Sequence, residues 1–143
     1  MSNIKVKTIL TIPQKAKAGI LKTIDAIRDL FGPHGEHWML GEEHATFYEG
    51  DEHPNTGKIL KDRLDMFCLL GAVKDVSGPF EDDARLALAL AIDENFGDDY
   101  DLNSEIDHEE VITSYNDTTD GGWRDILKVI KKAKKLVEEA ATS

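Results

Sequence analysis

The pattern of apolar and polar residues from Leu60 to Val73 predicts the central helix of the fold. In the first half, Leu60, Leu64 and Phe67 recur at helical spacing between charged residues, whereas the second half is apolar on nearly every side. A helix that is apolar all round is normally buried. We therefore predict a helix that begins at the surface and ends in the core, in which Gly71 lets another backbone approach closely.

Before this stretch, the pattern predicts a strand, a helix and a small β-hairpin. Apolar and polar residues alternate over residues 3–12, which indicates a strand or an N-terminal extension. Pro13 suits the first turn of a helix, and the Gly-Pro pair at 32–33 is a typical helix stop. Aromatic and apolar residues in segment 37–49 flank a Gly-Glu-Glu-His sequence at 41–44, which we interpret as the turn of a hairpin.

Three more helices are predicted after the central stretch. Residues 80–95 interleave leucines with alanines, so a broad face of this helix should be buried. A short helix is expected over residues 107–115, because it begins with the spacing of a capping box. The last helix, residues 122–140, has an apolar stripe with lysines mostly on the other side, and we expect that stripe to pack on the protein's own core.

Length and composition agree with a helix-dominated α+β fold in which a central buried helix, an amphipathic C-terminal helix and a small β-hairpin form one domain. We expect that domain to span 1–143, with its core in 13–140. One cysteine excludes an internal disulfide and fits a reducing compartment. The N-terminus lacks the apolar run of a signal peptide, and no stretch has the length of a membrane span, so we expect a cytoplasmic protein.

Charge is distributed unevenly along the chain, whose formal net charge is -11. Residues 24–123 hold 25 acidic and six basic side chains, and eleven acidic residues but no basic one lie between Arg85 and Arg124. Such a field repels nucleic acid and membrane surfaces, so we expect neither as a direct partner. It would attract a basic protein or divalent cations, although acidic residues also serve simply to keep small proteins soluble.

The acidic stretch follows the residue spacing of an EF-hand calcium loop over residues 99–110. Calcium takes six to eight oxygen ligands, and this spacing can supply them. Two features argue against calcium: Ser104 stands where the EF-hand has a glycine, and Gly97 breaks the preceding helix. The alternative is an acidic surface loop. The candidate ligands are Asp99, Asp101, Asn103, Glu105, Asp107 and Glu110.

Histidines and the single cysteine are the other candidates for chemistry. Imidazole is a common zinc ligand, but none of the histidine spacings is a zinc signature, and surface-loop histidines are the simpler interpretation. The four clustered histidines are His34, His37, His44 and His53. Cys68 could be a nucleophile if a histidine such as His108 lay beside it, but a free cysteine in so apolar a stretch is usually a small core residue.

Three short motifs occur in a fixed order: Trp38-x-x-Gly41, Cys68-x-x-Gly71-Ala72, and Tyr115-Asn116-Asp117 ahead of the last helix. This order resembles an uncharacterised small-domain family found in actinobacteria and phages, over roughly residues 20–140. The resemblance implies an intracellular, single-domain, helix-rich protein and carries no activity, substrate or cofactor. It also implies that Trp38, Gly41, Cys68, Gly71, Asn116 and Asp117 meet in space.

From these observations we expect a non-enzymatic protein whose acidic surface binds a basic protein partner. In a phage, that partner could be a nucleic-acid-binding defence protein, inhibited by a mimic of DNA charge. The first alternative is a small-ligand or calcium-binding protein that uses the acidic loop or a pocket near Trp38 and Cys68. A hydrolase or transferase that uses Cys68 is the last alternative. We expect no bound cofactor, and calcium is the one metal ion that the sequence could accommodate.

Overall fold

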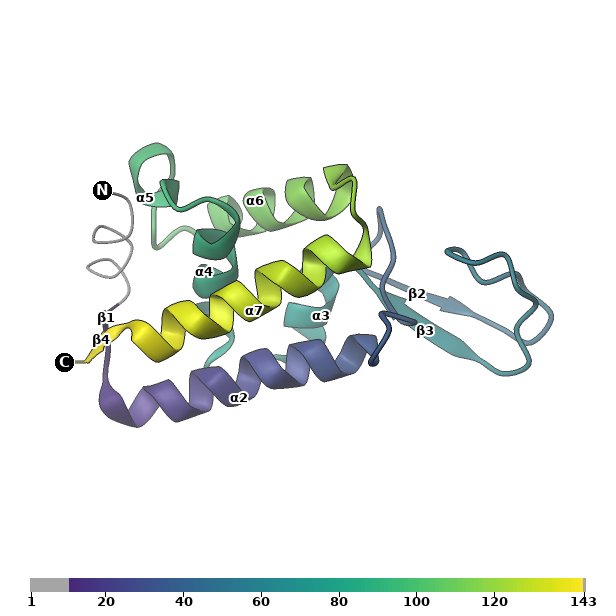
Figure 1. Cartoon of the computed structure of the whole chain (residues 1–143), viewed down its shortest axis with the longest axis horizontal. Coiled ribbons are helices and arrows are strands. Elements are labelled where there is room, and N and C mark those ends of the chain that lie inside the picture. The colour runs from purple at the N-terminus through teal and green to yellow at the C-terminus, as the bar shows by residue number, and fades with distance from the viewer. Residues whose placement is uncertain (1–10, 143) are drawn as a thin grey trace.

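The structure, a computed structural model, describes residues 11–142 (Figure 1). Of the strand predicted over residues 3–12, the part up to residue 10 lies outside the described residues. Its last two residues form strand β1 (Thr11–Ile12), which pairs in parallel with β4 (Ala141–Thr142). The two ends of the described chain are therefore held side by side.

Helices dominate the described residues, as the sequence predicts. They are α2 (Gln14–Phe31), α3 (Leu69–Val76), α4 (Glu81–Ile92), α5 (Phe96–Asp99), α6 (Glu105–Thr118) and α7 (Trp123–Glu139). α4 lies at the centre and packs against α2, α3, α6 and α7. Its alanines and two of its three leucines are buried, because small side chains let neighbouring helices approach from several directions. The helix-dominated α+β class is confirmed.

The predicted central helix is only half correct. Residues from Leu69 onward form α3, and they are buried through Val73. The residues just before them form strand β3 (Leu64–Phe67) instead of a helix. The helix begins at Leu69 because Asn116 Oδ1 accepts the Leu69 N–H at 3.0 Å and Cys68 Sγ accepts the Gly71 N–H at 3.3 Å, which satisfies two amides of its first turn.

A small antiparallel hairpin is present, but the predicted turn at 41–44 is wrong. Strand β2 (His44–Phe47) begins where that turn was expected, and it pairs with β3 from His44 opposite Phe67 to Phe47 opposite Leu64. The connection between the two strands is the long loop 48–63. Residues 44–67, which we call the arm, project from the helical body (Figure 1).

The remaining helix predictions are confirmed with shifted ends. The helix predicted over 80–95 ends at Ile92, and the short α5 follows it. The helix predicted over 107–115 starts earlier, because the Ser104 hydroxyl accepts the Asp107 N–H and caps α6. α7 buries its apolar stripe on the core, as expected.

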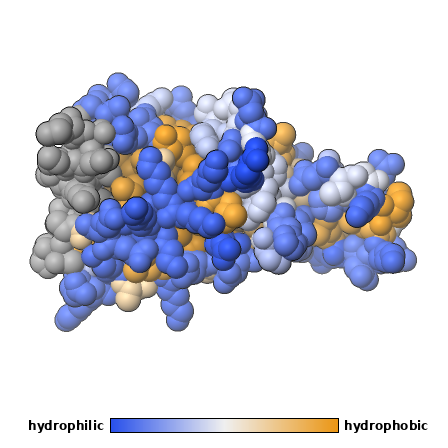
Figure 2. Space-filling view, viewed as in Figure 1, coloured by the Kyte–Doolittle hydropathy of each residue, from blue (hydrophilic) through white to orange (hydrophobic). Residues whose placement is uncertain are grey.

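The surface is mostly polar. Figure 2 shows hydrophilic residues over much of the face that α7 occupies, and hydrophobic residues near the outer end of the arm. The exposed apolar residues of the arm include Tyr48 and Ile59, each about three-fifths exposed (61% and 62%). In the part of the chain that the structure describes, no helix combines the length and apolar character needed to cross a membrane.

Candidate functional site

The side chain of Asn116 joins three segments of the chain. Its Oδ1 accepts hydrogen bonds from Trp38 Nε1 at 2.8 Å and from the Leu69 N–H at 3.0 Å. Its Nδ2 donates to the Met39 carbonyl and to Asp117 Oδ1, both at 3.2 Å. An amide group has two acceptor positions and two donor hydrogens. All four are therefore used within the protein, and none is left for a ligand.

Close backbone contact joins the same segments a few residues further on. A Cβ atom at Gly71 would lie 1.6 Å from the Glu43 carbonyl oxygen, so only glycine fits there. The Cys68 N–H also donates to that carbonyl, at 3.3 Å. Asp117 Oδ1 accepts the Gly41 N–H at 3.0 Å. The connection from α2 to the arm, residues 32–43, is thus held against the start of α3 and the end of α6.

The six residues of the three short motifs therefore lie around one junction. Their observed contacts are with one another and with neighbouring backbone, and they attach the arm to the helical body. This structural role explains the residue types. Asn116 makes four hydrogen bonds with its amide, Trp38 donates one from its indole N–H, and Gly71 lies where two backbones touch.

Cys68 lies within this junction and is 3% exposed. Burial raises the pKa of its thiol, and its sulfur accepts the Gly71 N–H. A nucleophilic cysteine needs the opposite setting, a partly open site that favours the thiolate. The hypothesis of a Cys68 nucleophile gains no support from this geometry.

The calcium-like residues are spread over two helices and the loop between them. Asp99 ends α5, and α6 already begins at Glu105, so half of the expected loop is helical. Asp101 Oδ1 accepts the Asn103 N–H, and Asp107 Oδ2 accepts the Asp101 N–H, both at 2.9 Å. Among the described residues, no three His, Cys, Asp or Glu side chains are grouped so as to hold a metal ion. Calcium binding by this loop stays a prediction.

The four clustered histidines do not converge. His53 Nδ1 accepts the Asn55 N–H and its Nε2 lies 3.0 Å from the Glu36 carbonyl, so both ring nitrogens are engaged and Nε2 carries the proton. His37 Nδ1 lies 2.7 Å from the Asp65 carbonyl. The ring of His44 stacks on Phe67 instead. The contacts of His37 and His53 join the arm to the connection from α2, and the contact of His44 lies within the arm. Together they account for three of the four rings without a metal.

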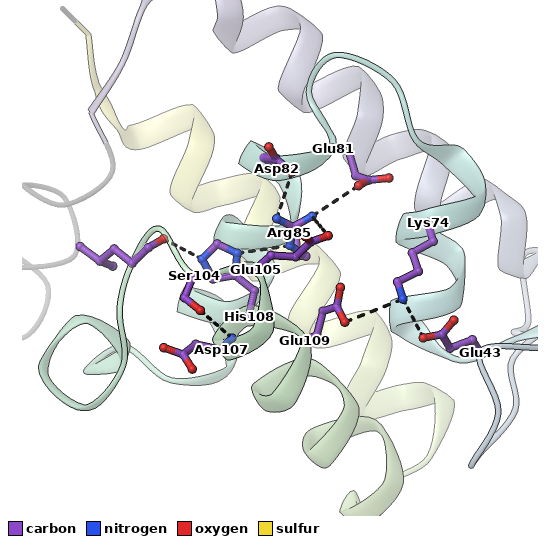
Figure 3. A network of polar contacts seen from close by, with 11 residues as sticks. Glu43, Lys74, Glu81, Asp82, Arg85, Ser104, Glu105, Asp107, His108 and Glu109 are labelled. Atoms are coloured by element: carbon purple, nitrogen blue, oxygen red, sulfur yellow. Dashed lines mark hydrogen bonds and ion pairs between the residues drawn. The ribbon is translucent and has the colours of Figure 1, made fainter.

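A charged network around the buried Arg85 joins α4 to α6 (Figure 3), and sequence reasoning missed it. Arg85 is 4% exposed, and its guanidinium lies 3.0 Å from Asp82, 3.4 Å from Glu81 and 3.7 Å from Glu105. Its Nε donates to His108 Nδ1 at 3.3 Å. The only signal in the sequence is an arginine among the apolar positions of helix 80–95. This cation is fully occupied inside the protein.

Lys74, on the same side of the molecule, is also paired internally. Its Nζ lies 2.8 Å from Glu43 Oε1 and 3.8 Å from Glu109 Oε1 (Figure 3). The hydrogen bond to Glu43 raises the pKa of Lys74 above its usual value. Arg85 and Lys74 therefore each pair with an acidic residue of α6 and with acidic groups outside it.

A groove of about 270 Å³ lies between the end of α4 and α6. Asp93 and Glu110 line it together with Tyr100 and Tyr115, and no Lys or Arg is among its lining residues. Glu110 was a candidate calcium ligand, whereas neither tyrosine was proposed as a site residue. Tyr100 lies inside the acidic stretch, and Tyr115 lies just after it, in the third of the short motifs.

A larger pocket, of about 580 Å³, lies where the arm meets the helical body. Trp38 lines it, as the alternative of a pocket near Trp38 and Cys68 anticipated, but Cys68 does not. Trp123, at the start of α7, forms the other aromatic wall and packs over Gly35, where a Cβ atom would lie 2.3 Å from the indole. This pocket and the α4–α6 groove are the two candidate sites.

Comparison with known proteins identifies no relative of this chain. No protein-family model, no curated protein and no solved structure matches the chain. The functional argument therefore rests on the groove, the pocket and the charge distribution.

Proposed function

We propose that this protein is a non-enzymatic interaction protein that binds a basic protein partner through the acidic side formed by the end of α4, α5 and α6. The observation that carries the proposal is the α4–α6 groove, which pairs Asp93 and Glu110 with two tyrosine rings and has no cation in its lining. A carboxylate with an aromatic ring beside it suits an arginine or lysine side chain, which forms an ion pair with one and stacks on the other.

The surrounding charge favours the same kind of partner. The groove lies in the part of the sequence from 86 to 123, which has eleven acidic residues and no basic one. Arg85, the last basic residue before this part of the sequence, is buried against three carboxylates. A surface of one sign raises the association rate of an oppositely charged protein and rejects partners of like charge.

The basic residues of the protein are gathered elsewhere. Ten of its 17 Lys and Arg residues belong to α2 and α7, which pack against each other. This segregation gives the molecule one acidic side and one lysine-bearing side. A basic partner would therefore meet a preferred orientation as well as an attractive charge.

The test compares two charge changes of equal size in the full chain. Asp93→Asn with Glu110→Gln neutralises the groove, whereas Asp29→Asn with Glu138→Gln removes the same charge from exposed positions on α2 and α7. Each protein is cross-linked in its own cells, and captured proteins are identified by mass spectrometry. We expect a basic protein that the wild type and the control variant capture and that the groove variant loses by about tenfold.

The two variants also give the contradicting result. If both capture the same proteins to the same extent, net charge alone governs the association and the groove has no role.

Competition with duplex DNA tests whether this protein acts as a mimic of DNA charge. A partner that is a nucleic-acid-binding protein should be displaced from this protein by DNA, because both would occupy its basic surface.

A further inference from the structure

We propose that the pocket between the arm and the helical body binds a methylated ammonium group, such as the trimethylammonium head of a small metabolite or a trimethylated lysine side chain. This site is separate from the α4–α6 groove and is lined by the connection from α2, the loop at 53–56 and the start of α7. Its volume of about 580 Å³ is in the range of small-ligand sites.

The aromatic walls of the pocket suggest a cation. The chain has two tryptophans, Trp38 and Trp123, and both line this pocket. The face of an indole ring is its negative pole and is the best aromatic partner for an organic cation. Trp38 is held by its hydrogen bond to Asn116 and Trp123 by its packing over Gly35, so both walls are fixed before a ligand arrives.

A carboxylate supplies the complementary charge. Glu36 lines the pocket, and among the described residues its Oε2 accepts a long hydrogen bond, 3.4 Å, from the His34 N–H. No Lys or Arg lines the pocket to neutralise it. An anionic ligand such as a phosphate would meet this carboxylate without any compensating cation, so the lining selects against it.

The remaining lining favours a methylated ammonium over a bare one. His53 offers no free acceptor, because its Nδ1 accepts the Asn55 N–H and its Nε2 donates to the Glu36 carbonyl. A primary ammonium needs several acceptors to replace its strongly held water. A methylated ammonium is weakly hydrated and can be enclosed by two indoles and one carboxylate.

The two indole N–H signals in a ¹H–¹⁵N correlation spectrum of the full chain provide the test, because both tryptophans belong to the site. The probes are choline, its neutral carbon isostere 3,3-dimethylbutan-1-ol, and a peptide that contains trimethyllysine. We expect choline or the peptide to shift both signals saturably and the neutral isostere to bind at least about tenfold more weakly. The tighter of the two cationic probes identifies the source of the ligand.

Glu36→Gln supplies the matched variant, since glutamine keeps the size of the side chain and removes its charge. It should weaken the binding of the cationic probes by about tenfold and leave that of the isostere unchanged. Equal binding of choline and its isostere to the wild type would overturn the proposal, because the pocket would then recognise shape alone. The absence of a saturable shift with either cationic probe would overturn it as well.

Discussion

Asn116 is fully buried and lies where the connection from α2, the start of α3 and the end of α6 meet. Its amide satisfies the Trp38 indole, the Leu69 N–H and the Met39 carbonyl together. A buried polar group left without a partner costs its full desolvation energy, so one side chain determines whether three other groups are satisfied. Asp117 next to it is exposed, and its bond to Gly41 can be replaced by water.

Replacing Asn116 should therefore cost far more stability than replacing its neighbour. We expect Asn116→Ala to lower the free energy of unfolding by about 3 kcal/mol, because three buried groups lose their partner. Asp117→Ala should lower it by about 1 kcal/mol or less. Urea denaturation followed by tryptophan fluorescence measures both. Equal losses in the two variants would mean that the amide is not the centre of the junction.

Some of this junction can be predicted from single residues. Gly71 in an apolar stretch predicts close backbone approach, and the structure places the Glu43 carbonyl there. A buried Asn beside an Asp also suggests a hydrogen bond with the central helix, and the Leu69 N–H donates that hydrogen bond to Asn116. The partners themselves could not be predicted, because Asn116 bonds to Trp38 across 78 positions of sequence and only the packed fold brings them together.

At the scale of helices and strands, His108 lies in the contact between α4 and α6 and is 3% exposed. Its Nδ1 accepts from Arg85, and its Nε2 lies 2.7 Å from the Leu102 carbonyl, so the ring is neutral with the proton on Nε2. Burial lowers the pKa of His108 below its usual 6.5, and the adjacent Arg85 lowers it further, against the opposing effect of the Leu102 carbonyl.

This shift predicts how stability depends on pH. Since His108 has the lower pKa in the folded state, the unfolded chain binds more protons between that pKa and 6.5. The stabilisation is therefore complete above pH 6.5 and decreases as the pH falls through this window. Urea midpoints at several pH values measure the decrease, and His108→Gln should reduce the slope. The same slope in wild type and variant would exclude His108 as the titrating group.

Sequence periodicity predicts the long helices well and the short strands poorly. α2, α4 and α7 bury long stripes at helical spacing, so local pattern and tertiary packing agree. β3 is four residues long, and its leucine and phenylalanine also fit helical spacing. Two sets of contacts decide whether these residues form a strand or a helix: the pairing with β2, and the caps that Cys68 and Asn116 supply to α3. The pairing and the Asn116 cap come from distant parts of the chain.

At the scale of the whole molecule, the segregation of charge follows from the order of the elements. α2 and α7 hold most of the lysines and pack together, whereas the acidic segment 86–123 forms the end of α4, α5 and α6. The sequence predicts the acidic side, because its charge is continuous along the chain. It does not predict the groove, which exists only because α4 and α6 pack with tyrosines at their edges.

The salt dependence of partner binding tests the central claim most directly. Isothermal titration calorimetry of this protein with the partner captured from its own cells is carried out between roughly 50 and 300 mM salt, a range over which screening of exposed charges strengthens. The account predicts that the affinity falls by about tenfold or more as salt rises, and that the groove variant shows a smaller fall than the control variant. An affinity that stays constant over this range would contradict it.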